Sequence, residues 1–409
     1  MLDSIQVAAS GLNGHQKGLK TISNDVANMN TPGFKGSNSQ FTDVFLQESD
    51  PSQGKNTGAG GGMQTLAPAI NFSAGEIRST GRDMDEALNG PGFFIVRDDR
   101  GRDLYTKAGR FDFNGEGKLV TVDQGYEVLG YNGTNTSVLQ PITIAGMRNS
   151  AFTPTTNVTF TGNLSTTISK RDTDTLDGTV DNVTVYDSQG QSHTLKFEFR
   201  VKRVPNASTG VNDIIQGDWL VTVMEGTTKL GEGEVKTAAS GADPTADRFS
   251  LTLPALSGQT STIAIVLGPG ITANSGGDAI QVSKDKVDGN AAGTISKSVI
   301  DVNGMVVVTY TNALTANGAK LAVAEFVTPE VLTRASGAYF EYTGNEPIRI
   351  VTLGNTTKLV NGSLELSNVD LTDQFSTMIL IQRGFQASSQ VLSTASEMIQ
   401  SLYDIKSRR

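Results

Sequence analysis

Apolar residues that recur every seven positions mark both ends of this chain, and they constrain its fold more than any other feature. The N-terminal set comprises Ile5, Leu12, Leu19 and Val26, followed at three-residue offsets by Ala8, His15, Ile22 and Met29. Alternating steps of four and three residues predict a helix whose apolar face pairs with another helix. Gly11, Gly14 and Gly18 lie within it, and a Gly costs up to about 1 kcal/mol in a helix interior. We therefore expect an N-terminal helix that is marginal until it packs.

The same spacing returns near the C-terminus with larger side chains. This set comprises Met378, Phe385, Leu392 and Ile399, followed at three-residue offsets by Ile381, Ser388, Ala395 and Leu402. Asp370 is a favourable N-cap, and Asp373 places a negative charge in the first turn, where the helix dipole stabilises it. We predict a helix from about Leu371 to Arg409.

Two apolar helices at opposite ends of a chain can pair as a coiled-coil-like stem if the chain leaves and returns at one place. A stem that a flexible linker separates from its own domain buries little against that domain, so another subunit has to cover it. The predicted polymerisation seam is Ile5, Leu12, Leu19, Ile22, Val26 and Met29 on the first helix, and Met378, Ile381, Phe385, Leu392, Ala395, Ile399 and Leu402 on the second.

Between the two helices the sequence is typical of β-structure. Short apolar runs such as residues 93–96 alternate with Gly-bearing turns, and Asn303-Gly304 between apolar residues predicts a hairpin. Residues 145–284 are rich in Thr, Ser and Asp, which favours a separate β domain inserted into the first. The Gly- and Ser-bearing stretch 47–68 has no periodicity and predicts a mobile linker.

These patterns together predict a mixed, mainly β fold with nested β domains and paired terminal helices. The predicted domains are the terminal helical stem (1–33 with 369–409), a linker (34–70), a first β domain (71–144 with 285–368) and an inserted outer β domain (145–284).

Composition excludes several classes of function. The chain of 409 residues has no Cys and only two His, which excludes disulfides, thiol catalysis, Cys-ligated zinc and sites built from several His. Its net charge of −9 argues against binding to a nucleic-acid backbone. No apolar run approaches the roughly 18 residues of a membrane span. The N-terminus lacks the basic and apolar regions of a secretory signal, which by itself indicates a cytoplasmic protein.

The motifs of hydrolases, P-loop enzymes, zinc proteases and dinucleotide-binding enzymes do not occur in the sequence. Asp172, Asp174 and Asp177 have part of the spacing of a calcium loop, but Leu176 and Val183 stand where ligands are required, which favours an acidic surface turn.

The remaining candidates for chemistry favour structural roles. The Gly-rich run 58–62 follows no predicted strand, which favours a flexible linker over a phosphate loop. His15 and His193 fall on predicted apolar faces, which favours packed side chains over general bases. The sequence therefore predicts neither an enzyme nor a bound cofactor or metal, and only a convergent acidic pair in a deep cleft would indicate otherwise.

Three stretches resemble the bacterial flagellar rod and hook axial proteins. The segment 22–35 is similar to the N-terminal signature A-N-x-N-T-x-G-[FY]-K of that family, and the residues that match the signature are Ala27, Asn28, Asn30, Thr31, Gly33, Phe34 and Lys35. The segment 362–371, which ends in Asn368, Val369, Asp370 and Leu371, resembles the closing signature together with 382–387. A block between 72 and 111 is similar to the shared β domain of the family.

The resemblance implies a structural subunit that polymerises into a hollow helical tube, with the terminal stem innermost. A chain of this length with a Thr-rich insert resembles the hook members more than the shorter rod members, which implies a flexible universal joint that transmits torque from rod to filament. A distal rod or hook-junction subunit remains an alternative, and so does a surface β adhesin or glycan-binding module.

The resemblance also implies partners and a location. The implied partners are further copies of the chain, the flagellar rod, the hook cap, the hook–filament junction proteins and the type III export apparatus. Export as an unfolded chain with an uncleaved signal implies a hook outside the cell, which replaces the cytoplasmic location that the N-terminus alone indicates. The resemblance implies no nucleic acid and no membrane insertion.

Overall fold

The computed structural model describes residues 2–45, 60–133, 138–169, 176–206, 208, 212–236, 248–253, 261–278, 280–345, 347–354 and 356–407. The chain divides into two compact units. The first comprises Met1–Gly146, Ser298–Val308 and Ala316–Arg409, and the second comprises Met147–Lys297 and Thr309–Thr315. Within these described ranges, thirty strands and two long terminal helices confirm a mainly β fold with helical ends.

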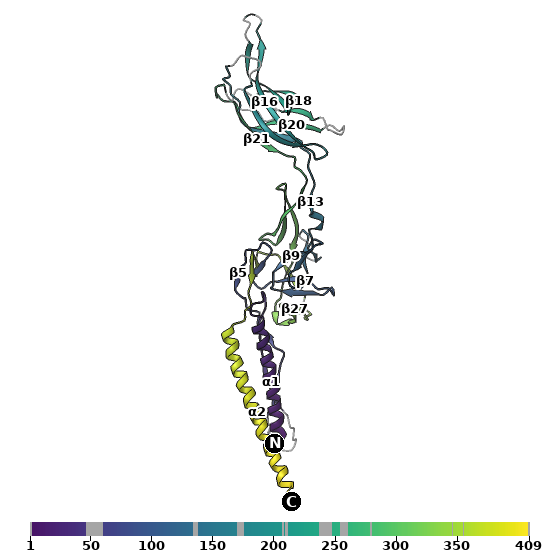
Figure 1. Ribbon diagram of the computed structural model, residues 1–409, viewed down its shortest axis with the longest axis vertical. Helices are drawn as coiled ribbons and strands as arrows, with labels where there is room; N and C mark the ends of the chain where they lie inside the picture. Colours follow the sequence, from purple (N-terminus) through teal and green to yellow (C-terminus); the bar gives the residue numbers. More distant parts are fainter. Residues whose placement is uncertain are drawn as a thin grey trace. The chain divides into compact units, whose positions relative to one another are not determined.

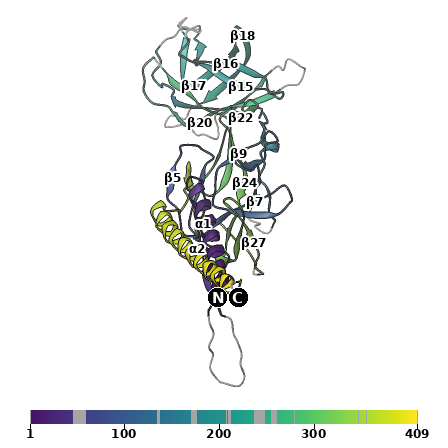
Figure 2. The same cartoon turned by 60° about the horizontal axis from the view of Figure 1, so that its bottom comes forward.

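Two helices of the first unit form an antiparallel pair, the helical stem. They are α1 (Leu2–Ala27) and α2 (Leu371–Ser407). They lie side by side, with both chain termini at the same end of the pair (Figures 1 and 2). Asp370 caps α2, because its Oδ1 accepts hydrogen bonds from the backbone N–H groups of Thr372 at 2.7 Å and Asp373 at 3.3 Å. Both predicted helices, and the predicted start of the second, are confirmed.

Glycines bring the two helices into close contact. A Cβ added to Gly11 would lie 2.8 Å from Oγ of Ser388, and a Cβ added to Gly384 would lie 2.4 Å from the ring of His15. The glycines that weaken α1 in isolation therefore allow the folded helices to approach each other more closely than larger residues would permit.

A β-hairpin packs along α1. Its strands are β2 (Phe41–Phe45) and β3 (Gly60–Thr65), and the flanking strands β1 (Ser37–Asn38) and β4 (Ala69–Ile70) pair with each other. The Met63 N–H donates to Oγ of Ser10 at 3.1 Å, and the methyl group of Met63 occupies the space that a side chain at Gly14 would need. The prediction of a mobile linker is thus wrong for residues 60–65, while 46–59 lie outside the described residues.

The rest of the first unit is a β domain. Its central antiparallel sheet has the order β24-β11-β7-β8-β27-β26, in which β24 comprises Thr315–Leu321. The elements are β5 (Ile77–Ser79), β6 (Glu86–Asn89), β7 (Phe93–Arg97), β8 (Asp103–Thr106), β9 (Phe111–Phe113), β10 (Leu119–Thr121), β11 (Glu127–Tyr131), β12 (Gln140–Pro141), β25 (Val323–Glu325), η2 (Pro329–Val331), β26 (Leu332–Ser336), β27 (Tyr339–Tyr342), β28 (Arg349–Val351), β29 (Lys358–Asn361) and β30 (Ser363–Glu365). In its core the ring of Phe72 packs edge-to-face on Phe93 and Phe340.

The chain passes between the units through elements that contain residues of both. These are η1 (Ala145–Met147), β22 (Gly293–Ile300), β23 (Met305–Tyr310) and β24 (Thr315–Leu321). Gly304, with φ of 75°, lies in the turn between β22 and β23, where its N–H donates to the carbonyl of Asp301. The hairpin predicted at Asn303-Gly304 is confirmed.

The second unit contains two four-stranded sheets around one apolar core. Its strands are β13 (Asn149–Ser150), β14 (Asn157–Asn163), β15 (Gly178–Tyr186), β16 (Ser192–Pro205), β17 (Asn212–Glu225), β18 (Thr228–Lys236), β19 (Arg248–Leu253), β20 (Ser261–Thr272) and β21 (Gln281–Val287). The sheet orders are β15-β16-β17-β18 and β19-β20-β14-β21. Phe160 of one sheet packs on Phe197 and Phe199 of the other.

Two candidate residues from the sequence lie in this second unit. His193 is buried, with Nδ1 at 2.8 Å from Oε1 of Glu225, as expected for a packed side chain. Asp177 is buried and pairs with Arg203 at 3.0 Å, so its carboxylate serves an internal ion pair rather than an exposed acidic turn. Asp172 and Asp174 lie outside the described residues.

Candidate functional site

The chain leaves α1 and returns to α2 through one buried polar cluster, which we call the stem junction (residues 33–37, 71–75 and 365–368, with Arg334). The first turn after α1 is held by side chains of the predicted motif. Asn28 Nδ2 donates to the Asn24 carbonyl at 2.8 Å, and the Thr31 hydroxyl donates to Asn28 Oδ1 at 3.2 Å. This turn directs the chain into the β domain.

Gly33 makes a close backbone approach at the junction. Its N–H donates to the carbonyl of Glu365 at 2.7 Å, and its φ is 69°, in the left-handed region. A Cβ at this position would lie 2.3 Å from the backbone nitrogen of Ala108. The site therefore requires glycine for both its conformation and its space.

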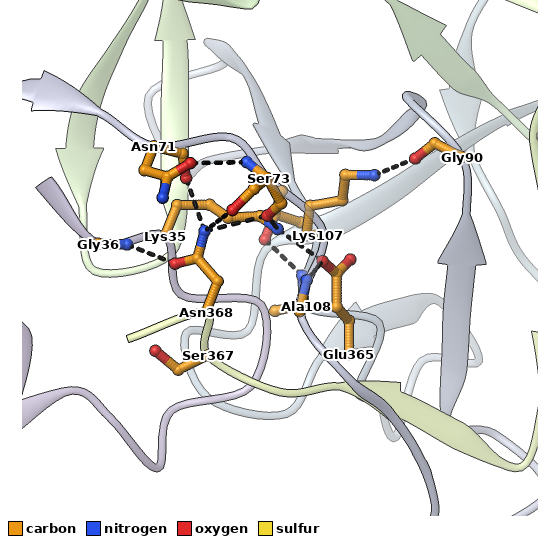
Figure 3. Close-up of polar contacts among 12 residues, drawn as sticks. Lys35, Gly36, Asn71, Ser73, Gly90, Lys107, Ala108, Glu365, Ser367 and Asn368 are labelled. Atoms are coloured by element: carbon orange, nitrogen blue, oxygen red, sulfur yellow. Dashed lines mark hydrogen bonds and ion pairs between the residues drawn. The ribbon is translucent and has the colours of Figure 1, made fainter. Parts of the chain in front are cut away.

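Lys35 and Glu365 form a buried ion pair at the centre of the junction. Lys35 Nζ lies 2.6 Å from Glu365 Oε1, and the two side chains are 0% and 2% exposed. Lys35 also donates to the Ser73 carbonyl at 2.7 Å, and the same Glu365 oxygen accepts the Gly75 N–H at 2.8 Å. Figure 3 shows Lys35 and Glu365 among the surrounding polar groups. The pair connects the segments that follow α1 and precede α2.

Asn368 joins the same segments through its amide (Figure 3). Its Oδ1 accepts the Gly36 N–H at 2.8 Å, and its Nδ2 donates to the carbonyls of Asn71 at 2.8 Å and Ser73 at 3.0 Å. One side chain thus binds three backbone groups. These hydrogen bonds fix the spacing between the three segments of the junction, 33–37, 71–75 and 365–368.

Arg334 covers the junction from the β domain. Its guanidinium lies 4.4 Å from the centre of the Phe34 ring, and it donates to the Lys35 carbonyl and to Ser37 Oγ. Asp25 in α1 accepts the Ser37 N–H at 2.7 Å. Burial raises the pKa of Asp25, while the Ser37 hydrogen bond and the Arg334 charge oppose that rise. These contacts attach the last turns of α1 to the β domain.

Lys107 is a second buried cation beside the junction. Its Nζ donates to the Gly90 carbonyl at 2.6 Å (Figure 3). The same Nζ lies 5.0 Å from the centre of the Phe93 ring. Burial lowers the pKa of Lys107 to about 8; the Glu365 carboxylate opposes this shift and the Lys35 ammonium adds to it.

We expect Lys107 to make stability depend on pH between about 8 and 10.5. Lys107 loses its proton near pH 8 in the folded protein but near the ordinary value of 10.5 in the unfolded chain. The folded state therefore gains stability as the pH rises through this window, and the gain is lost as the pH falls to 8. Relative to Lys107→Met, the wild type is expected to gain up to about 1.4 kcal/mol per pH unit in denaturant unfolding. A difference that stays constant from pH 8 to 10.5 would contradict this.

Most of the predicted seam residues are buried or half-buried in the structure, and Ile381 of α2 lies against Gly18 of α1. The buried or half-buried ones are Ile5, Leu12, Leu19, Ile22 and Val26 of α1, Met29 just after it, and Met378, Ile381, Leu392, Ala395 and Ile399 of α2. Phe385 and Leu402 are instead 39% and 51% exposed, so the described part of α1 does not cover them.

The other motif residues lie around the junction, and the Val369 N–H donates to Oγ of Ser367 at 3.4 Å. Ala27 ends α1 and Leu371 begins α2, while Asn30 is exposed. Val369 is half-buried, and a Cβ on Gly36 would lie 3.2 Å from it. Among the described residues, no three acidic or His side chains gather as a metal site. No described helix has the length and apolar character that crossing a membrane requires.

Comparison with known proteins gives a consistent result along the whole chain. Four family models match in order: Flagella basal body rod protein (5–35), Flagellar hook protein FlgE/F/G D1 domain (87–168), Flagellar basal body protein FlaE D2 domain (163–326) and Flagellar basal body rod FlgEFG protein C-terminal (360–405). The chain belongs to the flagellar hook and rod axial proteins.

Individual members of this family align over nearly the full chain. The flagellar hook protein FlgE of Treponema pallidum is 27% identical over 99% of this chain and 100% of its own length. FlgE of Salmonella typhimurium is 28% identical over 98% of this chain and 100% of its own length. The crystal structure of Helicobacter pylori FlgE2 aligns with 70% of this chain and 100% of its own, at a TM-score of 0.46 and 12% identity.

In this hook and rod axial protein, the two matched terminal segments are the ones that the junction joins. The N-terminal family model ends at residue 35 and the C-terminal model begins at 360, so each contains one member of the Lys35–Glu365 pair. The sequence did not single out Asp25, Arg334, Glu365 or Lys107. Of these, Glu365 lies inside the stretch 362–371 that resembles the closing signature, while Asp25 and Lys107 lie inside the other two resembling stretches, 22–35 and 72–111. The resemblance was therefore the available signal for these three residues.

Proposed function

We propose that this protein is the structural subunit of the bacterial flagellar hook, a helical tube that transmits motor torque from rod to filament. The observation that carries the proposal is full-length similarity to hook proteins named FlgE, including the inserted second unit that matches the D2 domain model. A rod or junction subunit remains the alternative within the same family. The proposed role is mechanical and requires no catalytic residue or cofactor.

Exposed apolar side chains on α2 support self-association. Phe375, Ile379 and Leu380 are 50%, 51% and 68% exposed, and Val391 is 50% exposed. A run of large apolar residues along one helix is typical of a surface that another chain covers. If one surface of each copy binds a different surface of the next copy, and the rotation between copies does not close a ring, the assembly grows as a helical filament.

We propose that the stem and the first β domain move together as the inner part of the tube. The buried Lys35–Glu365 pair and the three hydrogen bonds of Asn368 resist a change of angle between them. In this proposal, 1–33 with 369–409 form the innermost tube domain and the predicted seam residues make its contacts. Residues 145–284 would lie outside, where polar β surfaces permit copies to slide.

Family membership implies self-association within the flagellar axial structure outside the cell. We propose further contacts with the rod, the hook cap and the hook–filament junction proteins, and export through the type III apparatus without a cleaved signal. The proposal includes no nucleic acid and no membrane insertion.

Electron microscopy of the purified full-length chain in a strongly salting-out buffer tests the proposed function. Such salts strengthen apolar burial, so copies are expected to associate through their stems. Hollow, curved tubes would support a hook subunit, and straight tubes would favour the rod alternative. Monodisperse particles at high protein concentration, even with preformed hook fragments as seeds, would count against the proposal.

Leu392→Ala is expected to raise the critical concentration for tube formation at least tenfold. Leu392 is half-buried on α2, and its truncation removes apolar area that holds the stem, at a cost of about 2 kcal/mol. Sedimentation of tubes at a series of protein concentrations measures the effect. Ser389→Ala, at an exposed position on the same helix, is the matched control and is expected to assemble like the wild type. Equal behaviour of the two variants would contradict a role of the seam.

A further inference from the structure

The helical stem contains one of the two His of this chain, His15, and the other, His193, lies in the second unit. The ring of His15 lies against Gly384 of α2, where an added Cβ would come within 2.4 to 3.1 Å of three ring atoms. The centre of this ring also lies 6.1 Å from that of Phe41 in β2. His15 therefore lies where α1, α2 and the hairpin along α1 meet.

Within the described part of the chain, nothing around this ring accepts a hydrogen bond from Nδ1. That nitrogen is buried and has no hydrogen-bond partner there. A pocket of about 330 Å³ lies beside the ring, lined by α1, α2 and β3, and the other residues that line it are uncharged. Ser388 is the polar residue among them, and its Oγ lies 2.8 Å from where a Cβ on Gly11 would be. A positive charge on the ring would thus lie in apolar surroundings.

The charged residues nearest in sequence to these contacts are Lys17 of α1, Asp43 of β2 and Arg383 of α2, and all three are exposed. Strand β3 contains no charged residue. Lys17 and Arg383 are cations, which oppose a further positive charge on the ring. Asp43 would favour such a charge, but among the described residues it forms no ion pair with His15. The elements packed against His15 therefore provide it with no counter-ion.

These surroundings make proton uptake by the folded stem unfavourable. A neutral imidazole carries one N–H, whereas the protonated ring carries two. Because Nδ1 has no acceptor, protonation would add a buried N–H without a partner as well as a buried charge. Burial accordingly lowers the pKa of His15 below its ordinary value of 6.5. Gly384 has no side chain that could move aside, so the ring reaches water when α2 moves away from it.

We propose that His15 is a pH-sensitive contact of the helical stem: at mildly acidic pH its ring takes up a proton, and α2 separates from α1 at Gly384. The unfolded chain takes up this proton near pH 6.5 and the folded stem at a lower pH. The stability that neutral His15 contributes is therefore fully present above pH 6.5 and is lost as the pH falls below it. The separation of the helices within one subunit does not depend on the proposed function, whereas weaker tubes at acidic pH are a consequence that does.

The full-length monomer tests the proposal without assembly. One proton per chain changes the folding equilibrium constant by at most about tenfold per pH unit. From pH 7 to 5 this constant, measured by denaturant unfolding and helix circular dichroism, is expected to fall at least threefold more in the wild type than in His15→Gln, which cannot take up the proton. His193→Gln, at the other His of the chain, is the matched control and is expected to keep the wild-type pH dependence of the stem. An equal pH dependence of the wild type and His15→Gln would overturn the proposal.

A disulfide between the helices tests whether they separate. A Cβ at position 11 would lie 3.5 Å from the Cβ of Ser388, a distance that a disulfide spans. Gly11→Cys with Ser388→Cys therefore locks α1 to α2 one turn from His15, in a chain that has no Cys of its own. NMR titration of the His15 ring is expected to give a midpoint below 6.5 in the wild type. The oxidised variant is expected to bind this proton at least threefold more weakly than the same variant when reduced. Equal proton affinities in the two states would show that α2 does not separate at His15.

Tubes test the consequence for assembly. From pH 7.5 to 5.5 the critical concentration for tube formation is expected to rise at least threefold more for the wild type than for His15→Gln. An equal rise for both would overturn the inference and leave the proposed function intact. If the wild type forms no tubes even on preformed seeds, the proposed function is wrong, and the two measurements on the monomer still decide the role of His15.

Discussion

Replacing Lys35 with Met is expected to destabilise the first unit by about 3–5 kcal/mol, because it leaves Glu365 buried without its cation. Both side chains are almost fully buried, and one oxygen of Glu365 already lacks a hydrogen-bond partner among the described residues. The remaining Gly75 N–H and the Lys107 ammonium, whose Nζ is hydrogen-bonded to the Gly90 carbonyl, do not replace a positive charge at 2.6 Å. Denaturant unfolding, followed by a probe in the first β domain, measures the loss.

The matched control for this change is an exposed ion pair in the same unit. Lys118 lies 2.8 Å from Glu127, with side chains 38% and 31% exposed, and Lys118→Met is expected to cost less than about 1 kcal/mol. Adding Glu365→Leu to Lys35→Met is expected to recover much of the lost stability, because it removes the stranded charge. A similar small cost for Lys35→Met and Lys118→Met would show that the buried pair does not hold the junction.

The helices of the stem were predictable from the sequence because the patterns that indicate them lie within short, continuous segments of the chain. The heptad spacing from Met378 to Ile399 and the N-cap at Asp370 lie within consecutive turns, so they indicate the helix and its apolar face without further knowledge of the fold. The same spacing could not show how far α1 extends along α2. Phe385 and Leu402 fit the repeat as well as Leu392 does, yet they remain exposed.

The stem junction was not predictable because its partners are far apart in the chain. Lys35 and Glu365 are separated by 330 positions, and Arg334 reaches the Lys35 carbonyl from a strand with no motif of its own. The resemblance marked Lys35 and Asn368 as motif residues without indicating what they bind. Only the pairing of the chain's two ends shows that these residues share one network.

The strand β3 was missed because its composition is typical of a linker. Three consecutive glycines from 60 to 62 have low β-propensity, and the sequence analysis assigned them to a mobile segment. In the structure this strand packs on α1, where Gly14 leaves space for Met63 and Gly62 lies against Ser10. A glycine in each element thus leaves room for a side chain of the other element. A pattern within one short segment of sequence cannot show such a contact.

Gly33→Ala is expected to cost at least about 3 kcal/mol and to prevent normal tube assembly. A left-handed backbone costs a non-glycine residue about 1–2 kcal/mol, and overpacking adds about 1–3 kcal/mol. At Gly33 both terms apply, because φ is 69° and the new Cβ would lie 2.3 Å from the backbone nitrogen of Ala108. A backbone atom cannot rotate away as a side chain can, so the junction has to shift.

Gly81→Ala separates the two contributions. Gly81 has nearly the same φ, 71°, but a Cβ there would meet nothing within 4 Å. Its expected cost is therefore the conformational term alone, about 1–2 kcal/mol, with tube assembly unchanged. The excess cost of Gly33→Ala then measures how tightly the segment after α1 is pressed against the β domain. If both variants lose the same stability in denaturant unfolding, the close approach at Gly33 contributes nothing to holding the segment after α1 against the first β domain.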